Sequence, residues 1–174
     1  MQIRSGARLL AALVASNLLL AGPASAAAIK GQVFGAGAPI AGSTVTLWAA
    51  SPGDPKQLAQ TRTGTDGRFA LSAGGTPGKG ATLYLVARGG QPTASKEPGD
   101  NPAIALMTIV GGTPPATVTI NEMTTVASVW THNQFIDGTA IKGQPLQLKI
   151  AAGNVLEFFR LGDTPMGRSV RAKE

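Results

Sequence analysis

The chain has 174 residues, of which 14% are charged and 5% aromatic, and its formal net charge is +6. It contains 23 glycines, 12 prolines, one histidine and no cysteine. This composition is too apolar for a disordered chain, and it lacks the strict glycine period of a collagen. Without cysteine there is no disulfide, thiolate metal site or catalytic thiol, and a single histidine leaves little scope for imidazole chemistry.

Residues 1–26 have the three parts of a secretory signal peptide. Two arginines precede an apolar run over residues 9–21, and a Gly-Pro pair then leads to small residues that end at Ala26. The apolar run is shorter than the roughly 20 residues that a membrane-spanning helix needs. We therefore expect removal after Ala26, with Ala28 as the alternative. The product is expected to be secreted, extracellular or periplasmic, and to keep no membrane segment.

The basic side chains that remain after such cleavage are scattered. They stand singly along the chain, for example at Lys30, Lys56 and Lys79. A nucleic-acid-binding chain has a basic stripe with interleaved aromatic residues. We therefore expect no nucleic-acid partner, and a cell-surface polymer or another exported protein is the partner class left open.

Residues 27–90 are predicted to form a small β-sandwich. Runs with alternating apolar and polar side chains are separated by turns rich in Gly and Pro, a pattern typical of this fold. The predicted strands are 29–34, 43–49, 57–63, 68–72 and 81–88. The predicted buried face holds Val45, Leu47, Phe69 and Leu83. We expect residues 35–42 to form a turn, and Asp66-Gly67 to close a hairpin.

Three segments of this half carry the motifs of a known module. Residues 29–33 read I-K-G-Q-V, residues 39–47 read P-I-A-G-S-T-V-T-L, and residues 65–69 read T-D-G-R-F. In this order they resemble the carboxypeptidase regulatory-like (transthyretin-like) β-sandwich. The resemblance covers about 60 residues of the chain. It implies a transthyretin-like or Ig-like fold and no catalytic group, because that module serves as a spacer, adhesin stalk or accessory domain.

The chain changes character after residue 90. Residues 91–102 are rich in Gly, Pro and charge and are expected to form a linker or long loop. Asn101-Pro102 then has the chemistry of a helix start, so we predict a helix over 103–110. A short β-branched strand is predicted over 117–120.

Two amphipathic helices complete a predicted helical segment over 103–161. In the first, over 123–136, the residues Met123, Val126, Ala127 and Trp130 recur at helical spacing on one face, and we expect the sheet or the other helix to cover this face. The second begins at Pro145 and continues over 146–161, with one apolar face formed by Leu148, Ala152, Val155 and Phe159. Residues 162–174 are polar and basic, and we expect a disordered tail.

The second half has a resemblance of its own. Residues 121–130 read N-E-M-T-T-V-A-S-V-W, similar to a stretch that follows a like sandwich in exported bacterial proteins of unknown function. Those proteins continue through a glycine-rich segment, and residues 156–174 depart from that pattern. Two explanations stay open: a truncated or frameshifted reading frame, or a naturally short member.

No catalytic, metal or cofactor motif emerges from the reactive side chains. His132 is alone, without the paired spacing of a metal site. Ser128 lies on the same predicted helical face as His132, but no serine has the G-x-S-x-G elbow. We expect neither an enzyme nor a bound cofactor.

Trp48 and Tyr84 are the candidate ligand-binding residues. Both are predicted on the sheet face opposite the core, where an exposed aromatic ring can stack on a sugar. The competing interpretation is that the two helices cover them. The sequence thus favours a non-enzymatic exported structural or interaction protein, with a carbohydrate- or cell-wall-binding accessory module as the alternative.

Overall fold

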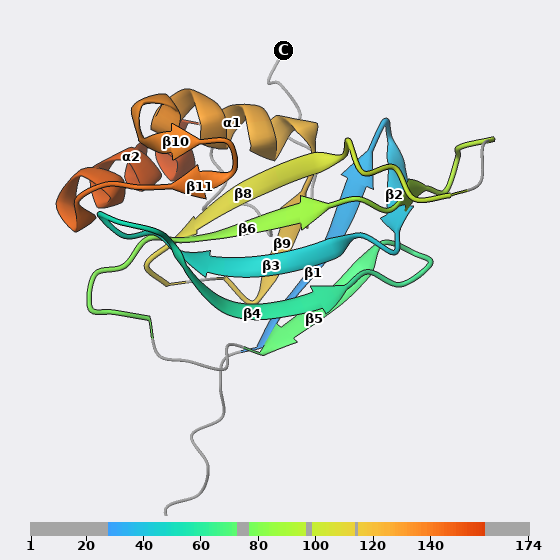
Figure 1. Cartoon of the computed structure of the whole chain (residues 1–174), viewed down its shortest axis with the longest axis horizontal. Helices are drawn as coiled ribbons and strands as arrows, with labels where there is room; N and C mark the ends of the chain where they lie inside the picture. The colour runs from blue at the N-terminus through green and yellow to red at the C-terminus, as the bar shows by residue number, and fades with distance from the viewer. Residues whose placement is uncertain (1–27, 73–76, 97–98, 114, 159–174) are drawn as a thin grey trace, which may run out of the picture.

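The computed structural model describes residues 28–72, 77–96, 99–113 and 115–158, with side chains as far as Asn154. This part of the chain is mainly β, with two sheets packed face to face and a helical segment beside them (Figure 1). A β-sandwich followed by helix is the predicted fold class, and it is confirmed. No described helix has the length and apolar character needed to span a membrane. Residues 1–26 and 162–174 lie outside the described residues.

The first sheet has the order β4-β3-β6-β8 and is antiparallel throughout. Its strands are Lys56–Arg62 (β4), Thr44–Ala49 (β3), Leu83–Arg88 (β6) and Ala105–Gly111 (β8). Leu47 lies opposite Leu85, and Leu85 lies opposite Thr108. β8 is an edge strand of this sheet, so its outer N–H and C=O groups need partners from elsewhere.

The second sheet is built around Ala28–Gly35 (β1). This strand pairs antiparallel with Arg68–Ser72 (β5) and parallel with Thr117–Ile120 (β9). Two short strands, Ala38–Ala41 (β2) and Gln91–Pro92 (β7), extend the sheet past the end of β1. The segment 35–42, predicted as a turn alone, therefore contains a strand.

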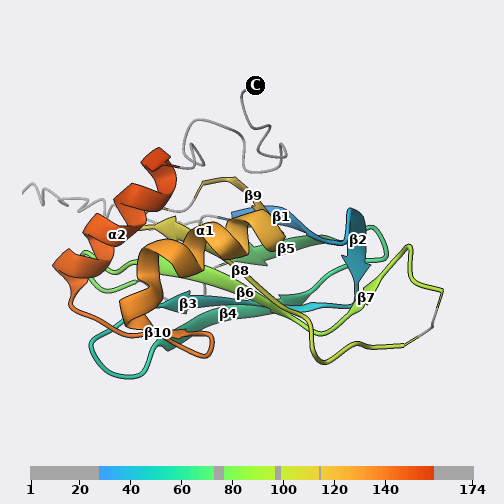
Figure 2. The same cartoon turned by 90° about the horizontal axis from the view of Figure 1, so that it is seen from above.

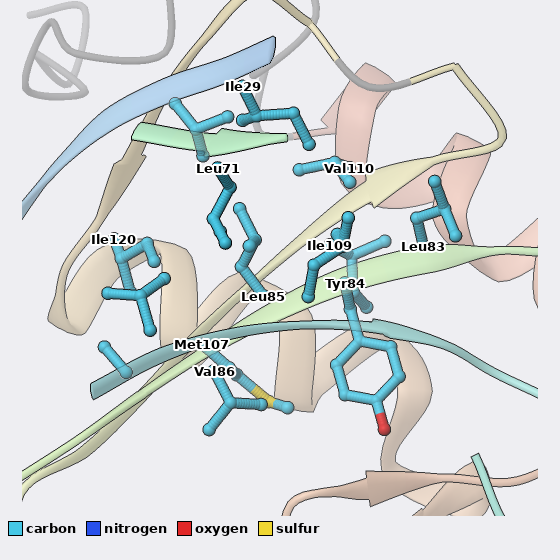
Figure 3. Close-up of a cluster of buried hydrophobic side chains, with 14 of the residues drawn as sticks. Ile29, Leu71, Leu83, Tyr84, Leu85, Val86, Met107, Ile109, Val110 and Ile120 are labelled. Carbon is cyan, nitrogen blue, oxygen red and sulfur yellow. The ribbon is translucent and has the colours of Figure 1, made fainter. Parts of the chain in front are cut away.

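The core fills the space between the sheets. Figure 3 shows Ile29 and Leu71 of the second sheet facing Leu85 and Val110 of the first. The four residues predicted for the buried face, Val45, Leu47, Phe69 and Leu83, are all buried. Gly31 lets neighbouring strands of the second sheet pack closely, because a Cβ there would lie 2.5 Å from the backbone oxygen of Val118 in β9 and would overlap the Phe69 ring of β5.

The Asp66-Gly67 turn is present, but the predicted hairpin is wrong. Gly67 has a φ of +74°, and Asp66 Oδ1 accepts the Arg68 N–H at 3.0 Å. The strands on either side join different sheets, since β4 pairs with β3 and β5 pairs with β1. Asp-Gly chemistry fixes a reversal of the chain, and here that reversal carries the chain from one layer to the other.

The predicted helix over 103–110 is also wrong, because this segment is β8. Asn101 Oδ1 accepts the Ala103 N–H at 3.1 Å, so Asn101 closes a short turn. Met107, Thr108, Ile109 and Val110 are buried in succession. A strand covered on both faces has no polar alternation, and periodicity cannot distinguish it from a buried helix. The sandwich therefore extends past residue 90 to include β8 and β9.

Two helices follow the sheets. Glu122–His132 (α1) begins with a capping box between Asn121 and Thr124 and runs into a single turn over Asn133–Phe135 (η1). A small hairpin, Ile136–Asp137 (β10) and Ala140–Ile141 (β11), leads to Pro145–Phe158 (α2). The start of the second predicted helix at Pro145 and the burial of Leu148 and Ala152 are confirmed. Figure 2 shows α1 and α2 lying on the same side of the sandwich.

Candidate interaction surface

Helix α1 runs along the outer edge of β8 and bonds to its backbone (Figure 1). The N–H of Met107 donates to Thr125 Oγ1 at 2.9 Å, and the N–H of Ile109 donates to Ser128 Oγ at 3.2 Å. Thr124 Oγ1 donates to the Met107 carbonyl at 3.0 Å. These hydroxyls take the place of a further strand and satisfy backbone groups that would otherwise be unpaired.

Because the sheet edge needs polar partners, α1 turns its polar face inward. Its buried residues are Thr124, Ala127, Ser128 and His132. The prediction that the sheet or the other helix covers Met123, Val126 and Trp130 is therefore wrong, and Ala127 alone of the four predicted residues is buried. A pattern of small hydroxyl residues at 124, 125 and 128 was the available signal for this edge contact.

The outer face of α1 is an exposed apolar stripe, formed by Met123, Val126, Val129 and Trp130. Their exposed fractions are 50%, 56%, 42% and 73%. Spacings of three, four and seven residues place them on one side of the helix, one above another. The sandwich holds this side outward through the hydrogen bonds to β8, so the exposure follows from the way α1 is anchored.

The segment that carries the stripe has little charge of its own. From Glu122 to Ile141 there is no Lys or Arg, and Glu122 and Asp137 are the acidic residues. Glu122 Oε1 accepts the Ala36 N–H at 2.6 Å, so its carboxylate is directed to the turn after β1. Helix α2 adds two exposed apolar side chains, Leu146 and Ile150.

An open groove of about 250 Å³ lies between the end of α1 and α2. It is lined by Thr131, Gln134, Phe135, Gln147, Ile150, Ala151 and Asn154. Among the described lining residues none is charged, and the Thr131 hydroxyl donates to the Ala127 carbonyl at 2.9 Å. The groove therefore adds contact surface beside the helices.

His132 is fully buried beneath α2. Its Nδ1 lies 2.9 Å from Thr131 Oγ1, its ring meets the Phe135 ring edge-on, and its Nε2 has no hydrogen bond to a described residue. Burial lowers its pKa to about 4, and the backbone groups of Leu148 and Ser128 oppose the shift. The imidazole is therefore neutral and is enclosed by the protein.

Ser128 and His132 lie on one face of α1, as the sequence predicted. This face is buried, and the two residues form no catalytic pair. The Ser128 hydroxyl accepts the Ile109 N–H, and both side chains have 0% exposure. A nucleophile needs access to its substrate and a base within hydrogen-bond reach. The described residues also contain no cluster of three or more His, Asp or Glu side chains suited to a metal ion.

Tyr84 is fully buried, and its Oη accepts the Ile141 N–H at 3.2 Å. Figure 3 shows its ring on the far side of the sheet from Ile29 and Leu71. Burial raises its pKa, and the hydrogen bond from Ile141 opposes this shift. Trp48 lies directly opposite Tyr84 in the sheet and is half-buried against the core. Because the Tyr84 ring is fully buried, Trp48 and Tyr84 cannot together form an exposed platform for a sugar.

Comparison with known proteins gives little further information. No family model and no curated protein matches the chain. Among solved structures, it is similar to a 9R-lipoxygenase from Cyanothece PCC8801, with 12% identity and a TM-score of 0.36. The match covers 88% of this chain and 27% of that protein, so the chain spans about a quarter of its length. A likeness of this extent carries no argument about fold or activity.

Proposed function

We propose that this chain is a non-enzymatic exported interaction protein in which the β-sandwich is a scaffold and α1 presents the binding surface. The observation that carries the proposal is the outward apolar stripe of Met123, Val126, Val129 and Trp130. Exposed apolar stripes on anchored helices are typical of protein-binding surfaces. Tryptophan is also among the residues that contribute most to binding energy at interfaces.

The position of the stripe supports this proposal. Three hydrogen bonds fix α1 to Met107 and Ile109, so the outer face is presented by a rigid helix. A rigid surface loses little conformational entropy on binding. The buried, neutral His132 and the hydrogen-bonded Ser128 support the absence of a catalytic role for these two residues.

Export and family membership are part of the same proposal. The signal-like residues 1–26 support secretion. Close packing of Gly31 against Phe69 and the Asp66-Gly67 turn are physical reasons for the motifs that resemble the carboxypeptidase regulatory-like sandwich. We do not propose the carbohydrate-binding alternative, because it depended on Trp48 and Tyr84 as exposed platforms.

Site-specific photo-cross-linking in the exporting cell tests the function. A photoreactive amino acid is placed at position 126 or 130, and at position 70 on β5 as a control, because Ala70 is also exposed. We expect defined adducts in the exported fraction from 126 and 130, and none from 70. Equal or absent adducts at all three positions contradict the proposal.

A further inference from the structure

The outer stripe of α1 has the spacing of a helix-pairing seam. Met123, Val126 and Trp130 follow one another at intervals of three and four residues, the interval of apolar positions in paired helices. Val129 widens the seam by one position. Figure 1 places α1 at the margin of the described structure, beyond β8, so a second body can approach it.

We propose that this stripe pairs with the same stripe of a second copy of the chain, with the two α1 helices antiparallel about a two-fold axis near Val126. This inference rests on the proposed function and names its partner. Around such an axis Met123 of each copy lies beside Trp130 of the other, and Val126 and Val129 fill the centre. A flexible thioether packs well against an aromatic ring.

The charge of the segment that carries the stripe favours a second copy over a lipid surface. Helices that bind anionic membranes carry Lys or Arg beside the apolar face, whereas residues 122–141 contain neither. In the antiparallel pair, the stripe itself brings no like charges together. Glu122 of each copy lies near the C-terminal end of the other α1 and is already bonded to Ala36 of its own chain.

The exposed area of the stripe predicts a weak dimer. The exposed parts of the four stripe side chains amount to about 400 Å², taking up to about 250 Å² for a whole aromatic residue. A standard stable interface buries about 800 Å² on each partner. We therefore expect association that depends on protein concentration, with monomer dominant when the protein is dilute.

Sedimentation of the purified exported protein between about 10 μM and about 1 mM tests the pairing. We expect the mean mass to rise towards twice that of the chain. V126E should weaken association at least about tenfold, because it places two carboxylates near the axis. A70E is the matched control and should associate like the parent. Val126 is 56% exposed, so the substitution leaves the core intact, which circular dichroism verifies.

A second measurement uses the absence of cysteine from the chain. V126C should give a disulfide-linked dimer on mild oxidation, and A70C should not. A protein that stays monomeric up to about 1 mM, or equal behaviour of V126E and A70E, overturns the inference. The inference is also overturned if Trp130 is protected from acrylamide quenching to the same extent at every protein concentration, because the chain would then cover its own stripe.

The two proposals fail in different ways. If the purified protein is monomeric while position 126 cross-links to a different protein in the exporting cell, the pairing is wrong and the proposed function stands. If position 126 gives neither a dimer nor an adduct, both are wrong.

Discussion

Ser128 Oγ accepts the backbone N–H of Ile109 and thereby occupies the position that a carbonyl of a neighbouring strand would take. Thr125 does the same for Met107, two residues earlier in β8. One helix thus closes an open sheet edge with side-chain hydroxyls. This arrangement explains why α1 buries its small polar residues and leaves its large apolar ones outside.

We predict that Ser128→Ala lowers the free energy of unfolding by about 1–3 kcal/mol, because it leaves the buried N–H of Ile109 without an acceptor. Urea denaturation measures this change. Val129→Ala is the matched control on the opposite face of α1, and it should change stability by less than about 0.5 kcal/mol. Equal effects of the two substitutions would contradict the edge contact.

The sequence could predict the strands whose two faces differ. Alternation in 43–49 and 68–72 identified β3 and β5, and Val45 and Phe69 were placed in the core. It could not identify β8, because that strand is buried on both faces by elements far away in sequence. The hydrophobic pattern of one segment carries no information about which distant elements cover that segment.

The sequence also failed to predict the candidate surface, for a related reason. Apolar residues at helical spacing ordinarily mark a buried face, and Met123, Val126 and Trp130 have that spacing. Which face of α1 turns inward was decided by the unpaired backbone of β8. The unpaired backbone groups of β8 result from the sheet topology, so helix periodicity alone could not reveal them.

Gly31→Ala should destabilise the fold by about 1–3 kcal/mol, the usual cost of overpacking. The new Cβ would lie 2.5 Å from the Val118 oxygen, which is backbone and cannot move aside without disturbing β9. Gly53→Ala is the control, because nothing lies within 4 Å of a Cβ there. Thermal unfolding of both variants checks the prediction. A Gly31→Ala protein as stable as Gly53→Ala would mean that β9 and the Phe69 ring do not pack closely against β1 at this point.

The single tyrosine offers a spectroscopic test of the buried site. Burial raises the Tyr84 pKa above its usual value of 10.0. The neutral phenol therefore stabilises the fold below pH 10, and this stabilisation is lost as the pH rises towards the raised pKa. We expect phenolate absorbance to appear only above pH 10 and together with loss of tertiary structure. Ionisation near pH 10 in a folded protein would contradict the burial of Tyr84.

Tyr84→Phe keeps the ring but removes the acceptor for the Ile141 N–H. We expect a loss of about 1 kcal/mol in the free energy of unfolding, the usual contribution of one such hydrogen bond. Faster hydrogen exchange should appear at Ile141, while exchange in the β3–β4 ladder stays unchanged. Unaltered exchange at Ile141 would show that the phenol does not hold the β10–β11 hairpin.

Acid should weaken the contact between α1 and α2 through His132. Its pKa in the folded protein is about 4, below the usual histidine value of 6.5. Between pH 6.5 and pH 4 the imidazole is therefore protonated in the unfolded chain but stays neutral in the folded chain. The free energy of unfolding that is present above pH 6.5 declines as the pH falls towards 4. We expect a loss on the order of 2 kcal/mol over this range, measured by urea denaturation at several pH values.

The variant His132→Gln separates this effect from general acid denaturation. It removes the only imidazole in the chain, so the difference in stability between the parent and the variant should shrink as the pH falls from 6.5 to 4.5. In the parent, the proton resonance of the His132 ring should show no titration near pH 6.5 while the protein is folded. A ring that titrates there in the folded state would mean that the imidazole is hydrated, and α2 would then not seal the inner face of α1.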